Sequence, residues 1–389
     1  MKELILLKSG EMAMKGLNRG SFEDKMIKNC KRALAGLGKF TFSKAQSTTY
    51  VEPRGEVDMP QAVERLSRVF GIAALCSARA VEKDYPAIEL AAAEYLAGEL
   101  LAARTFKVTA KRADKKFPMK SPEICVELGA FLLGRFPHLK VDVENPEVLV
   151  TVEIRDTEAY VHGRQIQGAG GIPVGTSGKA MLLLSGGIDS PVSGIMMAKR
   201  GLSVSAVHFQ SPPYTSERAL HKVRQLGGKM ARYCGNIPLY IVPFTEISEA
   251  IRENCPEPYA TIIMRRYMMR IAEKLAVAND CGTLITGESV GQVASQTIES
   301  LTCTQAGLKL PVMRPVIGMD KEEIVALARK LDTFELSVQP YDDCCAVFTP
   351  RRPKIRPKLW EAEAAERGLD SAALISRALE GVAEERVDS

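Results

Sequence analysis

The segment SGGIDS at residues 185–190 constrains the fold more than any other feature of the chain. It follows a continuous apolar run, residues 180–184, and precedes a stretch with helical periodicity, residues 191–199. A buried strand, a glycine turn and a helix in this order are typical of a doubly wound parallel sheet. Glycines in such a turn let backbone N–H groups and the helix N-terminus approach a phosphate. The segment therefore predicts a polyphosphate site.

This loop differs from the two commonest phosphate-binding motifs. It lacks the lysine and spacing of a Walker A loop, and it does not fit GxGxxG. The hydroxyls of Ser185 and Ser190 add hydrogen-bond donors. Asp189 is unusual here, because bound polyphosphate repels a carboxylate. We expect it to coordinate Mg²⁺ or to organise the loop, with helix capping as the simpler alternative.

Further pocket residues follow from the rule that ligands of open parallel sheets bind beyond the carboxyl ends of the strands. Residues 202–209 and 284–286 read as the neighbouring strands, and Arg265 and Gln296 offer additional polar contacts. Ordinary strand-end packing, or a solvated arginine, is the alternative for each single residue. The predicted nucleotide site comprises Leu183, Leu184, Ser185, Gly186, Gly187, Asp189, Ser190, His208, Phe209, Arg265, Gly287 and Gln296.

A glycine-rich stretch, residues 166–178, marks the clearest boundary in the chain. Residues 1–60 read as a small α+β module with a strand, a helix at 22–37 and one further strand at 40–51. In residues 61–165 helices alternate with paired strands. Residues 179–389 alternate strands and helices as a parallel sheet requires. We therefore predict an α/β protein with three domains and a linker.

Basic residues are concentrated in two clusters although the net charge is only +5. Residues 104–120 contain seven cations and one acid, and residues 351–358 contain five cations spaced by two prolines. Such clusters neutralise phosphates of nucleic acids, although a solvated basic face is an equal alternative. The candidate RNA-binding residues are Lys107, Lys111, Arg112, Lys115 and Lys116.

The nine cysteines have no regular spacing and form no CxxC pair, and the four histidines stand apart. We expect free thiols and no metal site formed by the protein alone. The sequence shows no secretory leader and no apolar run long enough to cross a bilayer. We therefore expect a cytoplasmic protein without a membrane partner.

Three segments carry a family resemblance. Residues 10–19, GEMAMKGLNR, are similar to a GELxLKGxNR pattern, and residues 185–192 and 287–297 extend the match. The loop resembles that of the N-type ATP pyrophosphatases, and nearly the whole chain resembles tRNA 4-thiouridine synthases linked to thiamine biosynthesis. The resemblance implies a ferredoxin-like domain at 1–60, a THUMP RNA-binding domain at 61–165 and a PP-loop domain at 179–389. It also implies ATP contacts at Leu183, Leu184, His208, Phe209, Arg265, Gly287 and Gln296.

The resemblance gives a meaning to the vicinal cysteines in residues 341–348. A family cysteine in this segment handles sulfur, and it aligns with Cys345, with Cys344 the close rival. Without the family, such a pair is more often inert packing. The chain ends at Ser389 without the rhodanese-like domain of some members, so the route of sulfur stays open. Lacking CxxC, it is not expected to hold the iron–sulfur cluster of archaeal relatives.

The resemblance implies that ATP activates uridine 8 of a bound tRNA, and Mg²⁺ is the second cofactor that we expect, from Asp189. The uridine O4 attacks ATP, pyrophosphate leaves, and a sulfur nucleophile displaces AMP. We expect a cysteine desulfurase to donate the persulfide. A sulfur-carrier protein is a further candidate acceptor of sulfur. The protein could also assemble as a homodimer. The alternatives are thiolation of a carboxylate for thiamine synthesis, RNA binding without catalysis, and RNA adenylation followed by attack of a nitrogen nucleophile.

Overall fold

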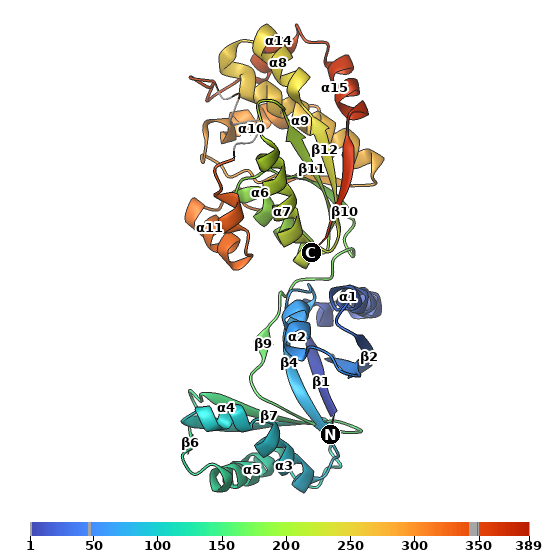
Figure 1. Ribbon diagram of the computed structural model, residues 1–389, viewed down its shortest axis with the longest axis vertical. Coiled ribbons are helices and arrows are strands. Elements are labelled where there is room, and N and C mark those ends of the chain that lie inside the picture. The colour runs from blue at the N-terminus through green and yellow to red at the C-terminus, as the bar shows by residue number, and fades with distance from the viewer. Residues whose placement is uncertain (1, 46–47, 342–347, 349, 389) are drawn as a thin grey trace. The chain divides into compact units, whose positions relative to one another are not determined.

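The computed structural model describes residues 2–45, 48–341, 348 and 350–388, which fold into two compact units (Figure 1). The first unit is Met1–Gly171 and the second is Ile172–Ser389. No helix within the described part of the chain is long and apolar enough to span a membrane.

The first unit contains one nine-stranded sheet. Its strands are β1 Lys2–Ser9, β2 Lys39–Ala45, β3 Thr48–Arg54, β4 Ile72–Val81, β5 Thr105–Arg112, β6 Lys140–Val141, β7 Val148–Ile154, β8 Ala159–His162 and β9 Ile166–Gln167. Its helices are α1 Arg19–Ala33, α2 Met59–Ser67, α3 Tyr85–Tyr95, α4 Ala97–Ala102 and α5 Ser121–Arg135, with the 3₁₀ turns η1 Glu11–Met14 and η2 Gly16–Asn18.

The first half of this sheet has the ferredoxin-like arrangement. The elements from β1 to β4 follow the order β-α-β-β-α-β, and the strands lie in the order β2-β3-β1-β4. The core between this sheet and α1 and α2 contains Ile5, Met26, Val51 and Leu66. The single strand expected at residues 40–51 is wrong: β2 and β3 form an antiparallel hairpin there.

The second half extends the same sheet in the order β4-β8-β7-β5-β6. Here α3 and α5 cover one face, with Phe106, Ile124, Leu128 and Val152 in the core (Figure 1). Strand β4 pairs with both β1 and β8, so it belongs to both halves.

The second unit contains a six-stranded sheet in the order β14-β13-β10-β11-β12-β15. Its strands are β10 Lys179–Leu183, β11 Ser203–Gln210, β12 Ile237–Pro243, β13 Thr283–Ile285, β14 Val312–Met313 and β15 Ala383–Val387. Its helices are α6 Asp189–Ala198, α7 Glu217–Cys234, α8 Thr245–Asn254, α9 Ala260–Ala278, α10 Ile298–Gln305, α11 Lys321–Lys330, α12 Phe334–Ser337, α14 Leu359–Glu366 and α15 Ser371–Glu380, with η3 Glu257–Tyr259 and η4 Ala294–Gln296.

Helices cover both faces of the second sheet, as its doubly wound pattern requires. Met181 on β10 packs toward the cluster that contains Tyr267 of α9, whereas the next residue, Leu182, lies toward Gly194 of α6. All neighbouring strands are parallel except β12 and β15. The chain runs from β10 to β11 on one side and returns to β13 on the other. This reversal places a crevice at the carboxyl ends of β10 and β13.

Candidate nucleotide site

A pocket of about 820 Å³, counting the solvent at its mouth, opens at the carboxyl ends of β10, β11 and β13. The predicted site residues line it, with the exception of Gly186. The lining also contains residues outside the predicted set, namely Val207, Met268, Met269, Thr286 and Glu288.

The loop after β10 is held by its own serines. The Ser185 backbone N–H donates to Ser190 Oγ at 3.0 Å, and the two hydroxyl oxygens lie 3.0 Å apart. The Gly187 N–H donates to Ser185 Oγ at 3.3 Å. Helix α6 begins at Asp189, two residues before the predicted start, so Asp189 and Ser190 belong to its first turn. The loop thus places hydroxyls and a helix N-terminus at one side of the pocket.

The adjacent strand ends are tied to this loop. Leu184 donates its N–H to the carbonyl of Val207 at 2.9 Å, and its own carbonyl accepts from Nδ1 of His208 at 3.0 Å. Because the carbonyl can only accept, the proton of His208 sits on Nδ1 in this contact. The position of the His208 ring is therefore fixed by the backbone beside the loop.

Asp189 is held from two distant elements. Lys321 Nζ at the start of α11 lies 2.9 Å from Oδ1, and Gln292 Nε2 lies 2.9 Å from Oδ2. Both contacts constrain the first turn of α6. Sequence reasoning named neither partner, because Lys321 is 132 positions away in the chain.

Glu288 is a buried carboxylate in the pocket wall, only 2% exposed. It pairs with Arg265 of α9, and it accepts from Arg314 Nε at 2.7 Å and from Thr286 Oγ1 at 2.8 Å. Burial alone raises the pKa of Glu288, but the charges of Arg265 and Arg314 outweigh burial and lower it. Glu288 is therefore a fixed anion that orients Arg265 at the pocket.

Gly287 permits the close approach of the β13 loop to α6. A Cβ atom at this position would lie 2.6 Å from the backbone nitrogen of Ser190 and 2.7 Å from the carbonyl carbon of Asp189. Backbone atoms cannot move aside as a flexible side chain does. Only glycine therefore fits here without displacing the first turn of α6.

The candidate RNA-binding residues lie on and after β5 in the first unit. Lys111, Lys115 and Lys116 are exposed. Lys107 donates to the carbonyl of Val143 at 2.9 Å, and Arg112 donates to the carbonyls of Phe117 and Met119, each at 3.0 Å. The Arg112 guanidinium thus stabilises the loop that follows β5. The three exposed lysines are the cations of this set that remain accessible to a partner.

The two candidate sulfur-handling residues, Cys344 and Cys345, lie outside the described residues. Phe348, which follows them, packs edge-on against Tyr214 with ring centroids 4.9 Å apart. No group of three or more potential metal ligands among His, Cys, Asp and Glu occurs within the residues that the structure describes.

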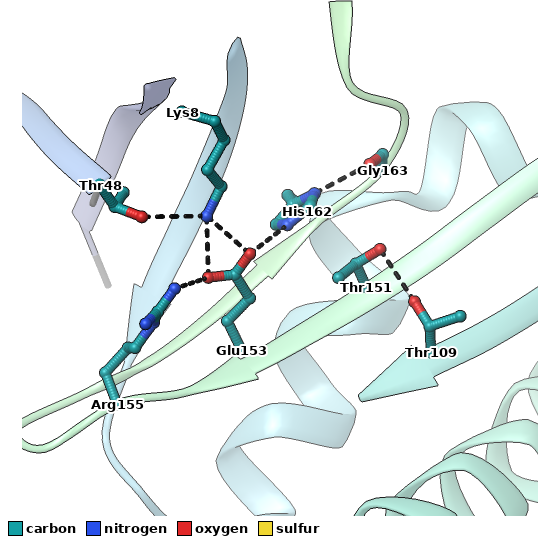
Figure 2. A network of polar contacts seen from close by, with 8 residues as sticks. All are labelled: Lys8, Thr48, Thr109, Thr151, Glu153, Arg155, His162 and Gly163. Atoms are coloured by element: carbon teal, nitrogen blue, oxygen red, sulfur yellow. Dashed lines mark hydrogen bonds and ion pairs between the residues drawn. The ribbon is translucent and has the colours of Figure 1, made fainter. Parts of the chain in front are cut away.

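A second buried polar cluster lies in the first unit (Figure 2). Glu153 of β7 is 1% exposed and pairs with Lys8 of β1 at 2.8 Å, with Arg155 at 2.6 Å and with His162 of β8 at 3.5 Å. Strands β1 and β7 are separated by β4 and β8 in the sheet, so the Lys8–Glu153 pair spans two intervening strands. The cluster joins the two halves of the first unit.

The comparisons with known families and relatives cover all parts of the chain. Residues 175–370 match the family described as thiamine biosynthesis protein (ThiI), residues 4–76 the ThiI ferredoxin-like domain, and residues 82–162 the THUMP domain. A probable tRNA sulfurtransferase of Acetivibrio thermocellus is 49% identical over 384 residues, which are 98% of this chain and 97% of the relative. One from Brevibacillus brevis is 46% identical over 97% of this chain and 94% of its own length.

A solved structure is similar over the full length. The crystal structure of a 4-thiouridine synthetase–RNA complex with bound ATP has a TM-score of 0.91 and 35% identity, and the match covers 100% of both chains. PH1313 from Pyrococcus horikoshii, with a TM-score of 0.66 and 24% identity, shares the fold over 85% of this chain. The three matched segments and the full-length identity leave one assignment: the chain belongs to the thiamine biosynthesis protein (ThiI) family.

Proposed function

We propose that this protein is an ATP-dependent tRNA sulfurtransferase that converts uridine 8 of tRNA to 4-thiouridine. One observation carries the proposal: the SGGIDS loop and three strand ends line a single pocket, in a chain that is 35% identical to a 4-thiouridine synthetase crystallised with RNA and ATP. The alternative of RNA binding without catalysis does not explain why these residues line one pocket.

The pocket lining divides into an apolar and a polar part that fit a nucleotide. Phe209, Met268 and Met269 offer apolar surface for an adenine ring. The Ser185–Ser190 loop offers hydroxyls and the first-turn amides of α6 for the triphosphate. Arg265, oriented by Glu288, supplies a cation for the α-phosphate, where charge develops during adenylation.

Mg²⁺ binding is a proposal that rests on the two carboxylates of the lining. Glu288 is fully engaged by two arginines and Thr286, so it is not available. Asp189 is the remaining carboxylate, beside the phosphate loop; Lys321 and Gln292 each contact one of its oxygens, so each oxygen retains a lone pair for a further ligand. Mg²⁺ in such sites is held mainly by the phosphates and by one or two carboxylates, which this pocket can supply. When bound, the ion would neutralise charge on the triphosphate.

The proposed chemistry has two steps. The uridine O4 attacks the α-phosphorus of ATP and pyrophosphate leaves; a sulfur nucleophile then attacks carbon four and AMP leaves. Cys345, with Cys344 as the alternative, is proposed to carry the sulfur that a cysteine desulfurase supplies as persulfide. Once the terminal sulfur has bonded to carbon four, a second thiol attacks the carrier sulfur, the S–S bond to the thiouridine breaks, and a disulfide with the carrier cysteine remains. Thiolation of a sulfur-carrier protein for thiamine synthesis, a homodimeric assembly and a cytoplasmic location complete the proposal.

RNA binding is proposed for the first unit, where Lys111, Lys115 and Lys116 are exposed. RNA helices are recognised largely through phosphates and 2′-hydroxyls, which suits such cations. Lys107 and Arg112 remain in the proposed set, although backbone carbonyls already engage both.

We also propose that the domains meet at the limits predicted from the sequence, at residues 60, 165 and 178.

A reconstituted reaction tests the proposal. Purified protein, ATP, Mg²⁺, tRNA, cysteine and a desulfurase should yield thiolated uridine, read from its near-ultraviolet absorbance. Asp189→Ala should abolish pyrophosphate release and thiolation together. Cys345→Ser should abolish thiolation and leave AMP transfer to tRNA intact. If the wild type releases pyrophosphate with a sulfur-carrier protein but never with tRNA, the carboxylate alternative replaces this proposal.

A further inference from the structure

An irregular basic segment crosses the surface of the second unit. Residues 350–358, called the basic strap below, contain five cations and form no helix or strand. Hydrogen bonds attach the strap to the unit. Thr297 Oγ1 donates to the carbonyl of Ile355 at 2.7 Å, the Lys354 N–H donates to the carbonyl of Pro258 at 2.9 Å, and the Arg351 N–H donates to Glu257 at 3.1 Å. The strap therefore holds its cations at a defined place.

Most of these cations lack a close carboxylate partner. Lys354 lies 3.6 Å from Glu361. Arg356 reaches Glu299 only at 4.0 Å, and its side chain is 84% exposed. Arg351, Arg352 and Lys358 are exposed, and the structure gives none of them an ion pair within the described ranges. An anionic partner could therefore bind these cations without first breaking many existing ion pairs.

Trp360, the only tryptophan of the chain, follows the strap directly. It lies in the first turn of α14 and is 62% exposed. Helix α14 packs inward through Ala362 and Leu359, so the indole is not needed for this core. Ile355 and Ile298 beside the Thr297 contact are also more than half exposed. The fold thus leaves the indole accessible to a partner beside the cations.

The strap is attached next to the nucleotide pocket. Thr297, which holds Ile355, directly follows Gln296, a residue of the pocket lining. Gln296 is fixed in turn, because its side-chain oxygen accepts from the Ser289 N–H and its carbonyl accepts from the Gly291 N–H at 3.0 Å. A polymer bound along the strap would therefore lie beside the nucleotide pocket.

We propose that the basic strap and Trp360 form an RNA-binding surface of the second unit, in which the cations contact phosphates and Trp360 stacks on an unpaired base near the target uridine. The inference rests on the proposed function and locates RNA contacts on the pocket unit itself. Unstacked bases of folded RNA pair with aromatic faces, and arginines contact phosphates beside them. An acidic protein surface would use the cations but would have no planar ring for Trp360 to stack on.

Tryptophan fluorescence tests the inference directly, since the chain has a single indole. Titration of the full-length protein with unmodified tRNA should quench the emission, with a midpoint equal to the dissociation constant from filter binding. ATP alone should not quench it. Trp360→Ala should weaken tRNA binding about tenfold, whereas Trp360→Phe, which keeps an aromatic face, should restore most of the affinity. ATP affinity of both variants should equal that of the wild type, which shows that they fold.

The cations provide a second measurement. Arg352→Glu and Arg356→Glu should weaken tRNA binding and make its salt dependence shallower, while Lys330→Glu at the exposed end of α11 should do neither. The inference is overturned if saturating tRNA leaves Trp360 emission unchanged, if Trp360→Ala binds tRNA as the wild type does, or if only the desulfurase quenches the indole. Those results leave ATP-dependent thiolation intact; a wild type that binds no tRNA overturns the proposed function instead.

Discussion

Lys321 Nζ and Asp189 Oδ1 lie 2.9 Å apart, although the residues are 132 positions apart in the chain. The contact joins the first turns of α11 and α6, and the packing of Val192, Ile324 and Ala328 between these helices supports it. A lysine at this place offsets the charge of a carboxylate beside the phosphate loop. The pair therefore reduces the repulsion between Asp189 and the triphosphate that is expected to bind there.

Lys321→Met should therefore lower tRNA-dependent pyrophosphate release by about 100-fold, a magnitude typical of a lost charged contact at a reaction centre. The variant retains most of the apolar length of the side chain and removes the charged ammonium group. Release of radiolabelled pyrophosphate measures the effect. Lys330→Met, in the last turn of the same helix and exposed, is the matched control and should react at the wild-type rate. Equal rates for both variants would refute the role of Lys321.

Gly287→Ala should weaken ATP binding at least about tenfold, because the new Cβ would displace the backbone of Ser190 or Asp189 from the phosphate loop. Isothermal titration with ATP measures the change. Gly282→Ala, five residues earlier, is the control, since nothing lies within 4 Å of its Cβ position. Wild-type affinity in Gly287→Ala would show that the close approach is unimportant for the nucleotide.

Glu288→Gln should lower the unfolding free energy of the second unit by about 3 kcal/mol, because it leaves two arginines without their buried carboxylate. The pKa of Glu288 is lower in the folded protein than in the unfolded chain, so its stabilisation is complete above the unfolded pKa and is lost as the pH falls through the folded value. Hydrogen exchange of the α9 amides should show the deficit at pH 7. A similar deficit in Glu299→Gln, an exposed acid, would contradict this account.

His162 should titrate far above the ordinary value for histidine. Burial lowers its pKa, but contacts with Cys76, Glu153 and the carbonyl of Gly163 outweigh burial and raise it to about 9. Its contribution to stability is therefore complete below about 6.5 and is lost as the pH rises through about 9. Proton NMR of the imidazole, assigned with His162→Gln, measures the value. A midpoint near 6.5 would show that the ion pair with Glu153 is not formed in solution.

Local sequence signals were sufficient for the strand ends of the pocket. The apolar run before Ser185 and the glycine after Thr286 marked where the chain leaves β10 and β13, and the rule for parallel sheets then assembled Leu184, His208 and Gly287. Arg265 and Gln296 were only candidates by their positions in the sequence, and the family resemblance predicted both as ATP contacts. The structure brings both to the same pocket.

The other contacts of the pocket depend on long-range packing, which local sequence signals do not reveal. Nothing near Lys321 indicates that α11 docks beside α6, because that contact depends on apolar faces far apart in the sequence. Glu288 directly follows Gly287, yet its two arginine partners come from α9 and from the segment after β14. The β2–β3 hairpin was missed because residues 45–48, Ala-Gln-Ser-Thr, contain no glycine, proline or asparagine to mark a turn.

Transfer of the α-phosphate tests the central claim most directly. Incubating the protein with [α-³²P]ATP and unmodified tRNA, without any sulfur donor, should leave labelled AMP attached to the RNA at uridine 8. The label should be absent with [γ-³²P]ATP, with Asp189→Ala, and with tRNA carrying cytidine at position eight. Label from the γ-phosphate, or α-label that persists on tRNA lacking that uridine, would contradict adenylation of the target base in this pocket.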